Sequence, residues 1–483
     1  MKKIYYLVFF LVLIMEPVCG QETLLSVEEQ YYDFLALQGI TERQYLNYRT
    51  LSDSVWTTPD ESHPWQNINL GARYEPFHNI FIRAYGPELF TSFNNNSPYG
   101  QNDGALWQGK GFNSSLTGGA RIAAYGVELT VRPQIVFSQN LDFDLVPSAY
   151  STGEAAIYGY YGVTSIDAPQ RFGDTPFFDY SWGDSEVRYT WKTLTVGFGT
   201  QSIWLGPAKI NPILLSNNAP PYPKLDVGLR RQPVKIKNIY LGDIETRAFW
   251  GRLSESDYFD TNDENNHNLL TGFTFSYSFP YLLQGFSIGL NRVMLSKWND
   301  NDYQSFFMLL WPFMENSNTG GDNRDQRLTF SFSYLLPVAG LEFYLEWGRN
   351  DFPSNKNIVV RDLFDTEAYT FGIVKNLLFT TSLQGKILIE ITRLDSHRVT
   401  AQTFYAHHVI TQGHTNQGQW LGAGLGTGGN SQYLGFTLFY NRGSSELFFQ
   451  RQAINADYAR YTPGKEQKAL MIIGANNFFN LFN

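Results

Sequence analysis

The amino-acid sequence predicts an antiparallel β-barrel that spans an outer membrane with about 16–18 strands. Three observations predict this fold class. Apolar and polar side chains alternate along most of the chain, a secretory leader precedes this pattern, and aromatic residues make up 16% of the chain although its mean hydropathy is only −0.27. A barrel reconciles many rings with low hydropathy, because its outer surface meets lipid while its lumen takes the polar half of each strand.

The first 20 residues have the pattern of a cleavable signal peptide. Two lysines precede an apolar run at residues 4–15, and small residues follow up to Gly20, where we expect cleavage. The run is too short to cross a bilayer comfortably as a helix. A lipid anchor on Cys19 is an alternative, but Glu16-Pro17-Val18 is a poor approach to a lipidated cysteine. Cys19 is the only cysteine, so the mature chain would contain no disulfide.

Residues 21–60 are expected to form a helical hairpin. Ser26 and Glu29 form a capping box, and apolar residues at helical spacing follow it up to Gly39. Thr41 and Gln44 form a second capping box, which predicts a second helix that continues through Leu51. A unit of this size is unstable alone. We therefore expect it to dock as a plug on the periplasmic side of the barrel.

Residues 61–483 are expected to form the barrel itself. Residues 273–279, 328–334 and 341–347 each alternate apolar with polar side chains, so every such strand has one face for lipid and one for the lumen. A strand of about 10 residues with its connection takes about 20–26 residues, which yields about 16–18 strands. Polar stretches at residues 94–98, 260–268, 299–302 and 316–325 are expected to be solvent-facing loops.

Composition excludes several other classes of protein. The net charge is −9 and there is no basic run, so the sequence predicts no nucleic-acid partner. The stretches after the leader hold no 18 consecutive apolar residues, which argues against membrane-spanning helices. Glu342 and Glu346 would lie about 13 Å apart along a strand, too far for the paired carboxylates of a glycoside hydrolase. We expect both to pair with lumen arginines or lysines, and we expect neither catalysis nor a cofactor or metal.

One segment departs from the strand pattern. Residues 204–221 are apolar and punctuated by prolines, yet they contain Asn211, Asn217 and Asn218. Buried amides need hydrogen-bond partners, which predicts a segment folded inward across the lumen. Two interpretations remain open. The segment is either a constriction that closes the pore, or a sugar platform on which Trp204 stacks against a pyranose ring while the asparagines bond to hydroxyl groups.

Several stretches together carry a family resemblance. They are residues 35–40, 102–113, 204–221, 346–351, 407–415, 439–443 and 449–452. With these stretches in order, the chain resembles the Wzi family of capsule assembly proteins of the Gram-negative outer membrane over roughly residues 30 to 460. The resemblance implies a barrel with a helical bundle at its periplasmic end, a lectin-like role in attaching capsular polysaccharide, and no catalysis.

The resulting prediction is a non-enzymatic outer-membrane barrel that binds capsular polysaccharide or exopolysaccharide and helps to attach or assemble it at the cell surface. A porin or glycan-export channel is the alternative, and a soluble sandwich lectin or hydrolase is a third hypothesis. The expected partners are capsular polysaccharide, outer-membrane lipid and the barrel insertion machinery. The candidate polysaccharide-binding or plug residues are Trp107, Asn113, Trp204, Asn211, Asn217, Asn218, His407 and His408.

Overall fold

The computed structural model describes residues 27–49, 63–66, 74–146, 166–260, 262–280, 283–300, 324–350, 366–394, 404–457 and 469–479. The predicted signal peptide and the predicted cap at Ser26 lie outside these residues. None of the helices within the described part of the chain is long and apolar enough to cross a membrane.

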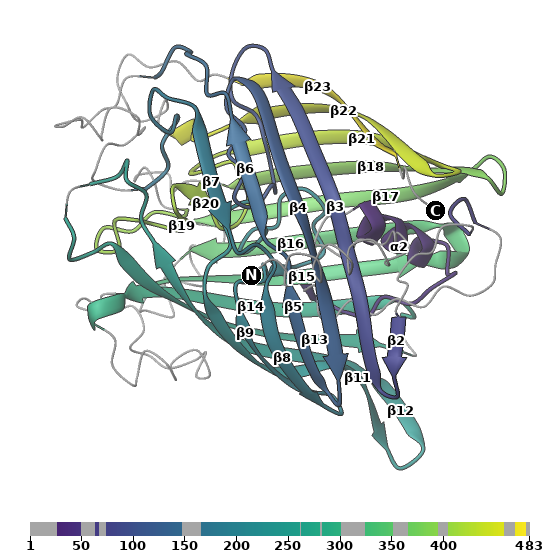
Figure 1. Cartoon of the computed structure of the whole chain (residues 1–483). Helices are drawn as coiled ribbons and strands as arrows, with labels where there is room; N and C mark the ends of the chain where they lie inside the picture. Colours follow the sequence, from purple (N-terminus) through teal and green to yellow (C-terminus); the bar gives the residue numbers. More distant parts are fainter. Residues whose placement is uncertain are drawn as a thin grey trace, which may run out of the picture.

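Antiparallel strands form one large sheet that wraps into a barrel (Figure 1). The strands of the wall are β2 (Tyr74–Phe77), β3 (Ile80–Asn94), β4 (Gly111–Ala124), β5 (Val127–Val131), β6 (Gln134–Ser138), β7 (Phe177–Ser181), β8 (Glu186–Trp191), β9 (Leu194–Gly199), β11 (Lys224–Ile236), β12 (Ile239–Ser254), β13 (His267–Phe279), β14 (Phe286–Lys297), β15 (Arg324–Leu336), β16 (Leu341–Asn350), β17 (Glu367–Leu378), β18 (Leu383–Leu394), β21 (Asn430–Tyr440), β22 (Gly443–Ala453) and β23 (Leu470–Phe479).

Each strand pairs with its neighbour along the chain, in a series of ladders that begins at β3 and ends at β23. The first half of β4 pairs with β6 and its second half pairs with β5, so β5 and β6 are one strand interrupted at Pro133. Proline has no N–H group to donate to a ladder. With β7 and β8 likewise counted as one strand, and the short β2 set aside, the described residues contain sixteen wall strands. The predicted antiparallel barrel is confirmed.

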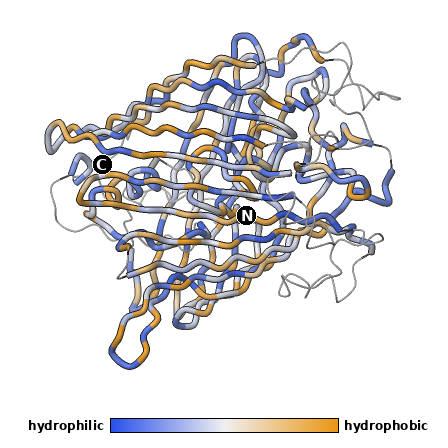
Figure 2. Tube along the Cα trace, turned by 180° about the vertical axis from the view of Figure 1, so that it is seen from behind, coloured by the Kyte–Doolittle hydropathy of each residue, from blue (hydrophilic) through white to orange (hydrophobic). Residues whose placement is uncertain are grey.

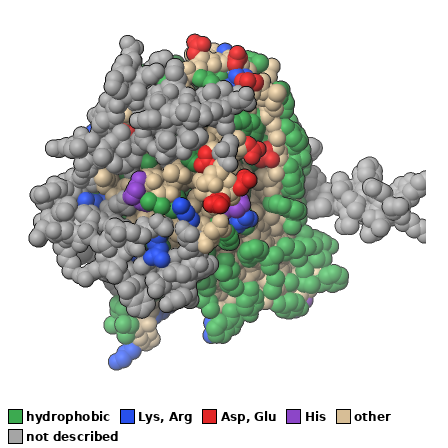
Figure 3. Space-filling model, turned by 90° about the vertical axis from the view of Figure 1, so that its left-hand side faces the viewer, with side chains coloured by type: hydrophobic (Ala, Val, Ile, Leu, Met, Phe, Trp, Pro, Cys, Tyr) green, Lys and Arg blue, Asp and Glu red, His purple; other side chains and the backbone are tan. Residues whose placement is uncertain are grey.

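The alternation of side chains places rings outside and hydroxyls inside. In β13, Phe275 is 40% exposed, whereas Thr274 and Ser276 are buried inside the barrel. Figure 2 shows apolar and polar residues alternating along the strands, and Figure 3 shows hydrophobic side chains covering the flank of the barrel. So large an exposed apolar surface is typical of a protein that contacts lipid.

The two ends of the barrel differ. At one end short turns join the strands, for example at residues 192–193, 237–238 and 441–442. At the other end the connections are long, for example residues 95–110 and 200–223. Helix α2 (Val27–Leu37) lies at the end with short turns (Figure 1). Its rings pack against Phe439 at the end of β21, with the rings of Phe34 and Phe439 stacked 4.7 Å apart.

The first predicted helix is confirmed and the second is wrong. Helix α2 ends at Leu37, Gly39 after it has a φ of +75°, and the Ile40 N–H donates back to the Leu35 carbonyl. Residues 40–49 contain no helix. Instead, the backbone N–H groups of residues 46–48 donate to the carboxylate of Glu245 on β12. These bonds to the wall satisfy donors that a helix would otherwise have to pair internally.

The main core of the protein lies inside the barrel. Buried apolar residues from residues 203–219 and 404–425 pack against one another and against inward side chains of the wall. Two short antiparallel strand pairs fix the backbone of these segments. They are β1 (Tyr48–Arg49) with β10 (Trp204–Leu205), and β19 (Thr415–Asn416) with β20 (Gln419–Trp420). The lumen is therefore partly filled by chain that folds back into it.

Candidate functional site

The segment that begins at Trp204 folds into the lumen, as the sequence predicts. Residues 213–216 are buried, and the Leu205 N–H donates to the Leu215 carbonyl across the fold of the segment. We call residues 203–219 the plug segment. Its position between the wall and residues 404–425 favours the interpretation as a constriction.

Wall carboxylates hold the plug segment by its backbone. Glu346 on β16 accepts hydrogen bonds from the N–H groups of Ala208 at 3.0 Å and Ile213 at 2.9 Å. Glu390 on β18 accepts from the N–H groups of residues 209, 210 and 211 at 2.8, 3.1 and 2.7 Å. Five backbone donors of the plug segment are thereby fixed to two wall strands.

The predictions for Glu342 and Glu346 have different outcomes. Glu342 pairs with Arg43 through two bonds of 2.6 and 2.7 Å and lies 3.5 Å from the Lys209 ammonium, as predicted. The prediction that Glu346 pairs with an arginine or lysine is wrong, because its two oxygens are used by the plug backbone. Alternation places both side chains in the lumen, but only the path of the plug segment decides which group each one meets.

Trp204 is an interior residue of the plug. Its side chain is 0% exposed, and its indole N–H donates to the Ala208 carbonyl at 3.0 Å. The guanidinium of Arg49 lies 4.7 Å from the centre of its ring. Both its polar atom and one ring face are thus occupied by the protein.

The three predicted asparagines of the plug segment differ in their surroundings. Asn211 is buried and accepts a hydrogen bond from the Gln101 side chain at 3.1 Å. Asn218 is also buried, accepts from the Asn102 N–H at 3.2 Å and donates to the Trp420 carbonyl at 3.1 Å. Asn217 is only half-buried, and it lines the cavity described below.

Trp107 and Asn113 hold the connection between β3 and β4. The Asn113 side chain is 0% exposed, donates to the carbonyls of Gly109 and Gly111, and accepts from the Ser138 hydroxyl at 2.6 Å. The Trp107 ring packs 5.1 Å from the ring of Phe172. These contacts fix the backbone and the Trp107 ring of the loop at residues 95–110.

His407 and His408 lie in the long connection between β18 and β21. The Nδ1 atom of His407 accepts hydrogen bonds from the N–H groups of Val409 at 3.2 Å and Ile410 at 3.1 Å. Burial lowers the pKa of His407, so its ring is a neutral acceptor near pH 7. The His408 side chain is exposed, with its ring 4.5 Å from that of His407. Among the described residues, no group of three or more His, Cys, Asp or Glu could hold a metal ion.

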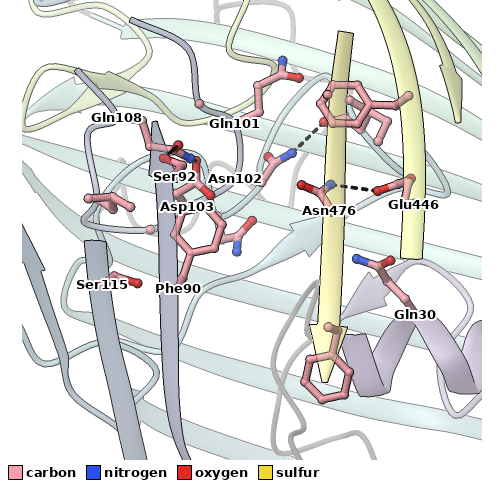
Figure 4. Close-up of a pocket in the computed structure, with 18 of the residues that line it drawn as sticks. Gln30, Phe90, Ser92, Gln101, Asn102, Asp103, Gln108, Ser115, Glu446 and Asn476 are labelled. Atoms are coloured by element: carbon pink, nitrogen blue, oxygen red, sulfur yellow. Dashed lines mark hydrogen bonds between the residues drawn. The ribbon is translucent and has the colours of Figure 1, made fainter. Parts of the chain in front are cut away.

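A large cavity occupies the lumen between α2, β3, the loop at residues 95–108, β22 and β23. Its volume is about 1920 Å³, roughly twice the upper size of a pocket for a drug-sized ligand. Of the eight residues predicted as candidates, only Asn217 lines it. Figure 4 shows polar side chains that point into it from several elements. Those used below are Gln101, Asn102, Asp103, Gln108, Glu446 and Asn476.

Two carboxylates of the cavity are held by neutral partners. Asp103 accepts a hydrogen bond from the Gln108 side chain at 2.6 Å. Glu446 on β22 accepts from the Tyr433 hydroxyl and from the Asn476 side chain, both at 2.9 Å. Carboxylates and side-chain amides are the groups that pair with the hydroxyls of a polar ligand.

Aromatic rings form a second part of the cavity wall. The ring of Phe448 stacks against that of Tyr433 at 5.5 Å and against that of Tyr99 at 6.4 Å. The Tyr99 hydroxyl donates to the Gln450 side chain at 2.7 Å, which fixes the ring. We call Tyr99, Tyr433 and Phe448 the aromatic shelf. It offers the cavity an apolar surface beside the carboxylates.

The cavity residues carry a weak signal in the sequence. Glu446 and Phe448 alternate with the exposed Leu447 and Phe449, so the strand pattern places both in the lumen. Nothing in that pattern distinguishes them from other inward residues. The cavity exists only because α2 and the plug segment leave this side of the lumen unfilled.

Asp103 should make the stability of the protein depend on pH. Burial raises the pKa of Asp103 from 3.8 to about 7, against the lowering effect of its hydrogen bonds. Between these two values the folded state binds more protons than the unfolded state, so the contribution of this carboxyl falls as pH rises. Asp103→Asn imitates the protonated form. We expect its melting temperature to exceed that of the wild type increasingly from pH 5 to pH 8, as measured by heat-modifiable gel migration. A difference that does not change with pH would contradict this expectation.

Comparison with known proteins places the fold in a family. The family model described as "Capsule assembly protein Wzi" matches residues 95–479. Among solved structures, the chain is similar to Wzi of Escherichia coli, an outer membrane protein involved in group 1 capsule assembly, with 12% identity, a TM-score of 0.52, and coverage of 83% of this chain and 81% of that one. It is also similar to OmpT of Vibrio cholerae, with 9% identity, a TM-score of 0.36, and coverage of 84% and 97%. No curated protein matches it. Since the family model covers most of the chain, this protein belongs to the Wzi family of capsule assembly proteins.

Proposed function

We propose that this protein is a non-catalytic outer-membrane barrel that binds capsular polysaccharide or exopolysaccharide in its lumen and helps to attach or assemble it at the cell surface. The observation that carries the proposal is the lumen cavity, which combines the aromatic shelf with carboxylates and amides. Family membership supports the role in capsule assembly. The similar Escherichia coli protein is described as a carbohydrate-binding β-barrel, which supports binding rather than catalysis.

The chemistry of the cavity suits a sugar chain. A pyranose ring has an apolar face, which packs on aromatic rings, and hydroxyls at its edge, which both donate and accept hydrogen bonds. The aromatic shelf supplies the first surface. Around it, Asp103 and Glu446 accept hydrogen bonds, and the amides of Gln101 and Asn476 can both donate and accept.

The orientation in the membrane follows from the two ends of the barrel. Outer-membrane barrels have short turns on the periplasmic side and longer loops outside. In this orientation α2 faces the periplasm and the long connections face the medium. The exposed rings of the wall contact outer-membrane lipid. Export would use the leader at residues 1–20, and the barrel insertion machinery would place the strands in the membrane.

Deletion of the gene tests the proposed role. We expect the deletion strain to release its capsule into the medium, because the surface attachment is lost, and we expect the purified protein to retain capsular polymer. Capsule imaging and polymer assays of cells and medium measure this outcome. Normal retention of the capsule by the deletion strain would overturn the proposal.

Tyr99→Ala tests whether the cavity is where the glycan binds. Loss of one stacking ring removes about 1–1.5 kcal/mol, so we expect the affinity for the polymer to fall by roughly tenfold. Tyr125→Ala is the matched control, because Tyr125 is 74% exposed in the turn after β4 and lies outside the cavity. Both variants should keep heat-modifiable gel migration, which reports a folded barrel. Equal affinity of both variants would place the glycan elsewhere.

A further inference from the structure

The short turns at the α2 end of the barrel carry no negative charge. In the described part of the chain they are residues 78–79, 125–126, 192–193, 237–238, 337–340, 379–382 and 441–442, and they contain two lysines and one arginine but no aspartate or glutamate. The connection at residues 255–266, at the opposite end, contains five carboxylates and no lysine or arginine. The two ends of the barrel therefore differ in charge, although the protein as a whole is acidic.

One hairpin projects beyond the rim at the α2 end (Figure 1). The ladder of β11 with β9 stops at Leu229, and the ladder of β12 with β13 extends only to Ile244. Beyond these residues β11 and β12 pair with each other as far as Ile236 and Ile239. We call residues 235–239 the hairpin tip. It stands clear of the neighbouring strands on both sides.

The hairpin tip has an apolar side and a charged side. Ile236 and Ile239 lie directly opposite each other in the ladder, so their side chains share one side of the hairpin, and they are 61% and 60% exposed. Lys235 precedes Ile236 along the strand and therefore points to the other side, while Lys237 occupies the turn. An apolar pair beside two ammonium groups is typical of a segment at a membrane–water interface, because the apolar pair enters the membrane while the lysines reach the headgroups.

The lysines of the tip keep their charge available to a ligand. Within the described part of the chain, neither Lys235 nor Lys237 forms an ion pair, and both are exposed. Arg231, which lies nearer the barrel, is instead 2.6 Å from the carboxylate of Asp243. A third exposed lysine, Lys192, lies in the turn between β8 and β9, and β9 is the strand next to β11. Three lysines therefore extend from one part of the rim.

The shape of this surface suits a lipid layer better than a protein. Pro233 on β11 has no N–H group to donate to an added strand, and two register shifts interrupt the ladder of β11 with β12, so the edges of the hairpin do not favour strand addition. Other turns at the same end expose single apolar side chains, among them Val338 and Phe379. A protein partner would need one compact patch, whereas a lipid layer meets the whole rim.

We infer that the hairpin tip, with Lys192 beside it, binds the anionic headgroups of phospholipids in the periplasmic leaflet of the outer membrane. The inference rests on the orientation proposed above and not on glycan binding. Ile236 and Ile239 enter the apolar layer, while the ammonium groups of Lys235 and Lys237 contact lipid phosphates. Attraction to an anionic surface increases with each lysine, so the tip selects phosphatidylglycerol over lipids without net charge.

Binding of short-chain phospholipids to the purified protein in micelles of neutral detergent tests the inference. The probes are phosphatidylglycerol, phosphatidylcholine, glycerol 3-phosphate and polyglutamate, and native mass spectrometry measures their binding. We expect the wild type to bind phosphatidylglycerol roughly tenfold more tightly than phosphatidylcholine, and Lys235→Gln with Lys237→Gln to remove most of this preference. Ile236→Asn with Ile239→Asn should weaken the binding of both lipids alike, because it removes apolar contact with the acyl chains.

Arg252→Gln with Lys297→Gln is the matched control. It removes the same number of positive charges as the lysine variant, but at the opposite ends of β12 and β14. We expect it to leave the preference for phosphatidylglycerol unchanged. Heat-modifiable gel migration of every variant establishes that the barrel is folded.

Each result decides the inference. A wild type without a preference for phosphatidylglycerol would overturn it, as would a preference that the lysine variant keeps. Glycerol 3-phosphate bound as tightly as phosphatidylglycerol would also overturn it, because the tip would then recognise free phosphate and not a lipid. Polyglutamate bound in place of lipid would overturn it in favour of an acidic protein partner.

The lipid experiment is independent of the capsule experiment, because none of its probes contains a sugar. If the lipid preference is found while the deletion strain keeps its capsule, the lipid contact stands and the proposed function fails. If the deletion strain releases its capsule while the wild type shows no lipid preference, the proposed function stands and this inference fails.

Discussion

Asp226→Ala is expected to destabilise the barrel by about 3–5 kcal/mol, because it breaks a buried network of charges. Asp226 on β11 bonds to Arg188 through two contacts of 2.9 and 2.5 Å and to Arg247 at 2.9 Å, and all three side chains are at most 1% exposed. Glu186 also bonds to Arg188, at 2.7 and 2.9 Å. Without Asp226, the guanidinium groups of Arg188 and Arg247 lose the carboxylate that both of them contact, in a site that excludes water.

Equilibrium unfolding in urea, with refolded protein in detergent micelles, measures this loss. Asp257→Ala is the control, because Asp257 is exposed in the connection after β12, and we expect it to change stability by less than about 0.5 kcal/mol. A decrease in the free energy of unfolding of less than about 1 kcal/mol for Asp226→Ala would contradict this expectation, because it would show that Arg188 and Arg247 do not need the Asp226 carboxylate.

Glu346→Ala combined with Glu390→Ala is expected to release the plug segment and open the lumen to ions. The two carboxylates accept five backbone hydrogen bonds from residues 208–213. Each buried donor that loses its partner costs about 1–3 kcal/mol. The ladders of the wall do not involve these side chains, so the barrel should remain folded. We expect the wild type to show no steady large conductance in planar bilayers and the double variant to show frequent openings.

Glu264→Ala is the control for this experiment, since it removes an exposed carboxylate that does not contact the plug segment. Heat-modifiable migration of all three proteins establishes that the barrel is intact. Steady large conductance of the wild type would instead favour the porin alternative. A double variant as closed as the wild type would mean that apolar packing among residues 203–219 and 404–425 suffices to hold the plug.

The wall of the barrel follows from local sequence. In β13 and β15, the two-residue period of rings and hydroxyls assigns each side chain to lipid or lumen, and the structure has Phe330 39% exposed while Thr329 is buried. The two-residue period predicts the face of each side chain because side chains of a strand point alternately to its two faces, independently of the rest of the chain. The inward fold of residues 204–221 was predictable for a related reason, since its apolar and amide composition suits neither lipid nor water.

The second helix shows where local patterns fail. Residues 41–51 contain a capping box and helical spacing in the sequence, yet the backbone N–H groups of residues 46–48 bind Glu245, a residue about 200 positions away in the chain. A capping box reports the local preference of the backbone, and it carries no information about an acceptor that folding brings from a distant strand. The same limit applies to Glu346, whose position in the lumen was predictable but whose backbone partners were not.

The fold class, the inward and outward faces of the strands and the presence of a segment inside the lumen are predictable from the amino-acid sequence. These properties depend on side-chain periodicity and composition, which are local. Which inward residues face empty space depends on how distant segments pack. The side chains of Trp204 and Asn113 are fully buried, whereas Tyr99, Asp103 and Glu446 line the cavity. A cavity is what remains after distant segments have packed, so its lining depends on where α2 and the plug segment end and not on any pattern within one strand.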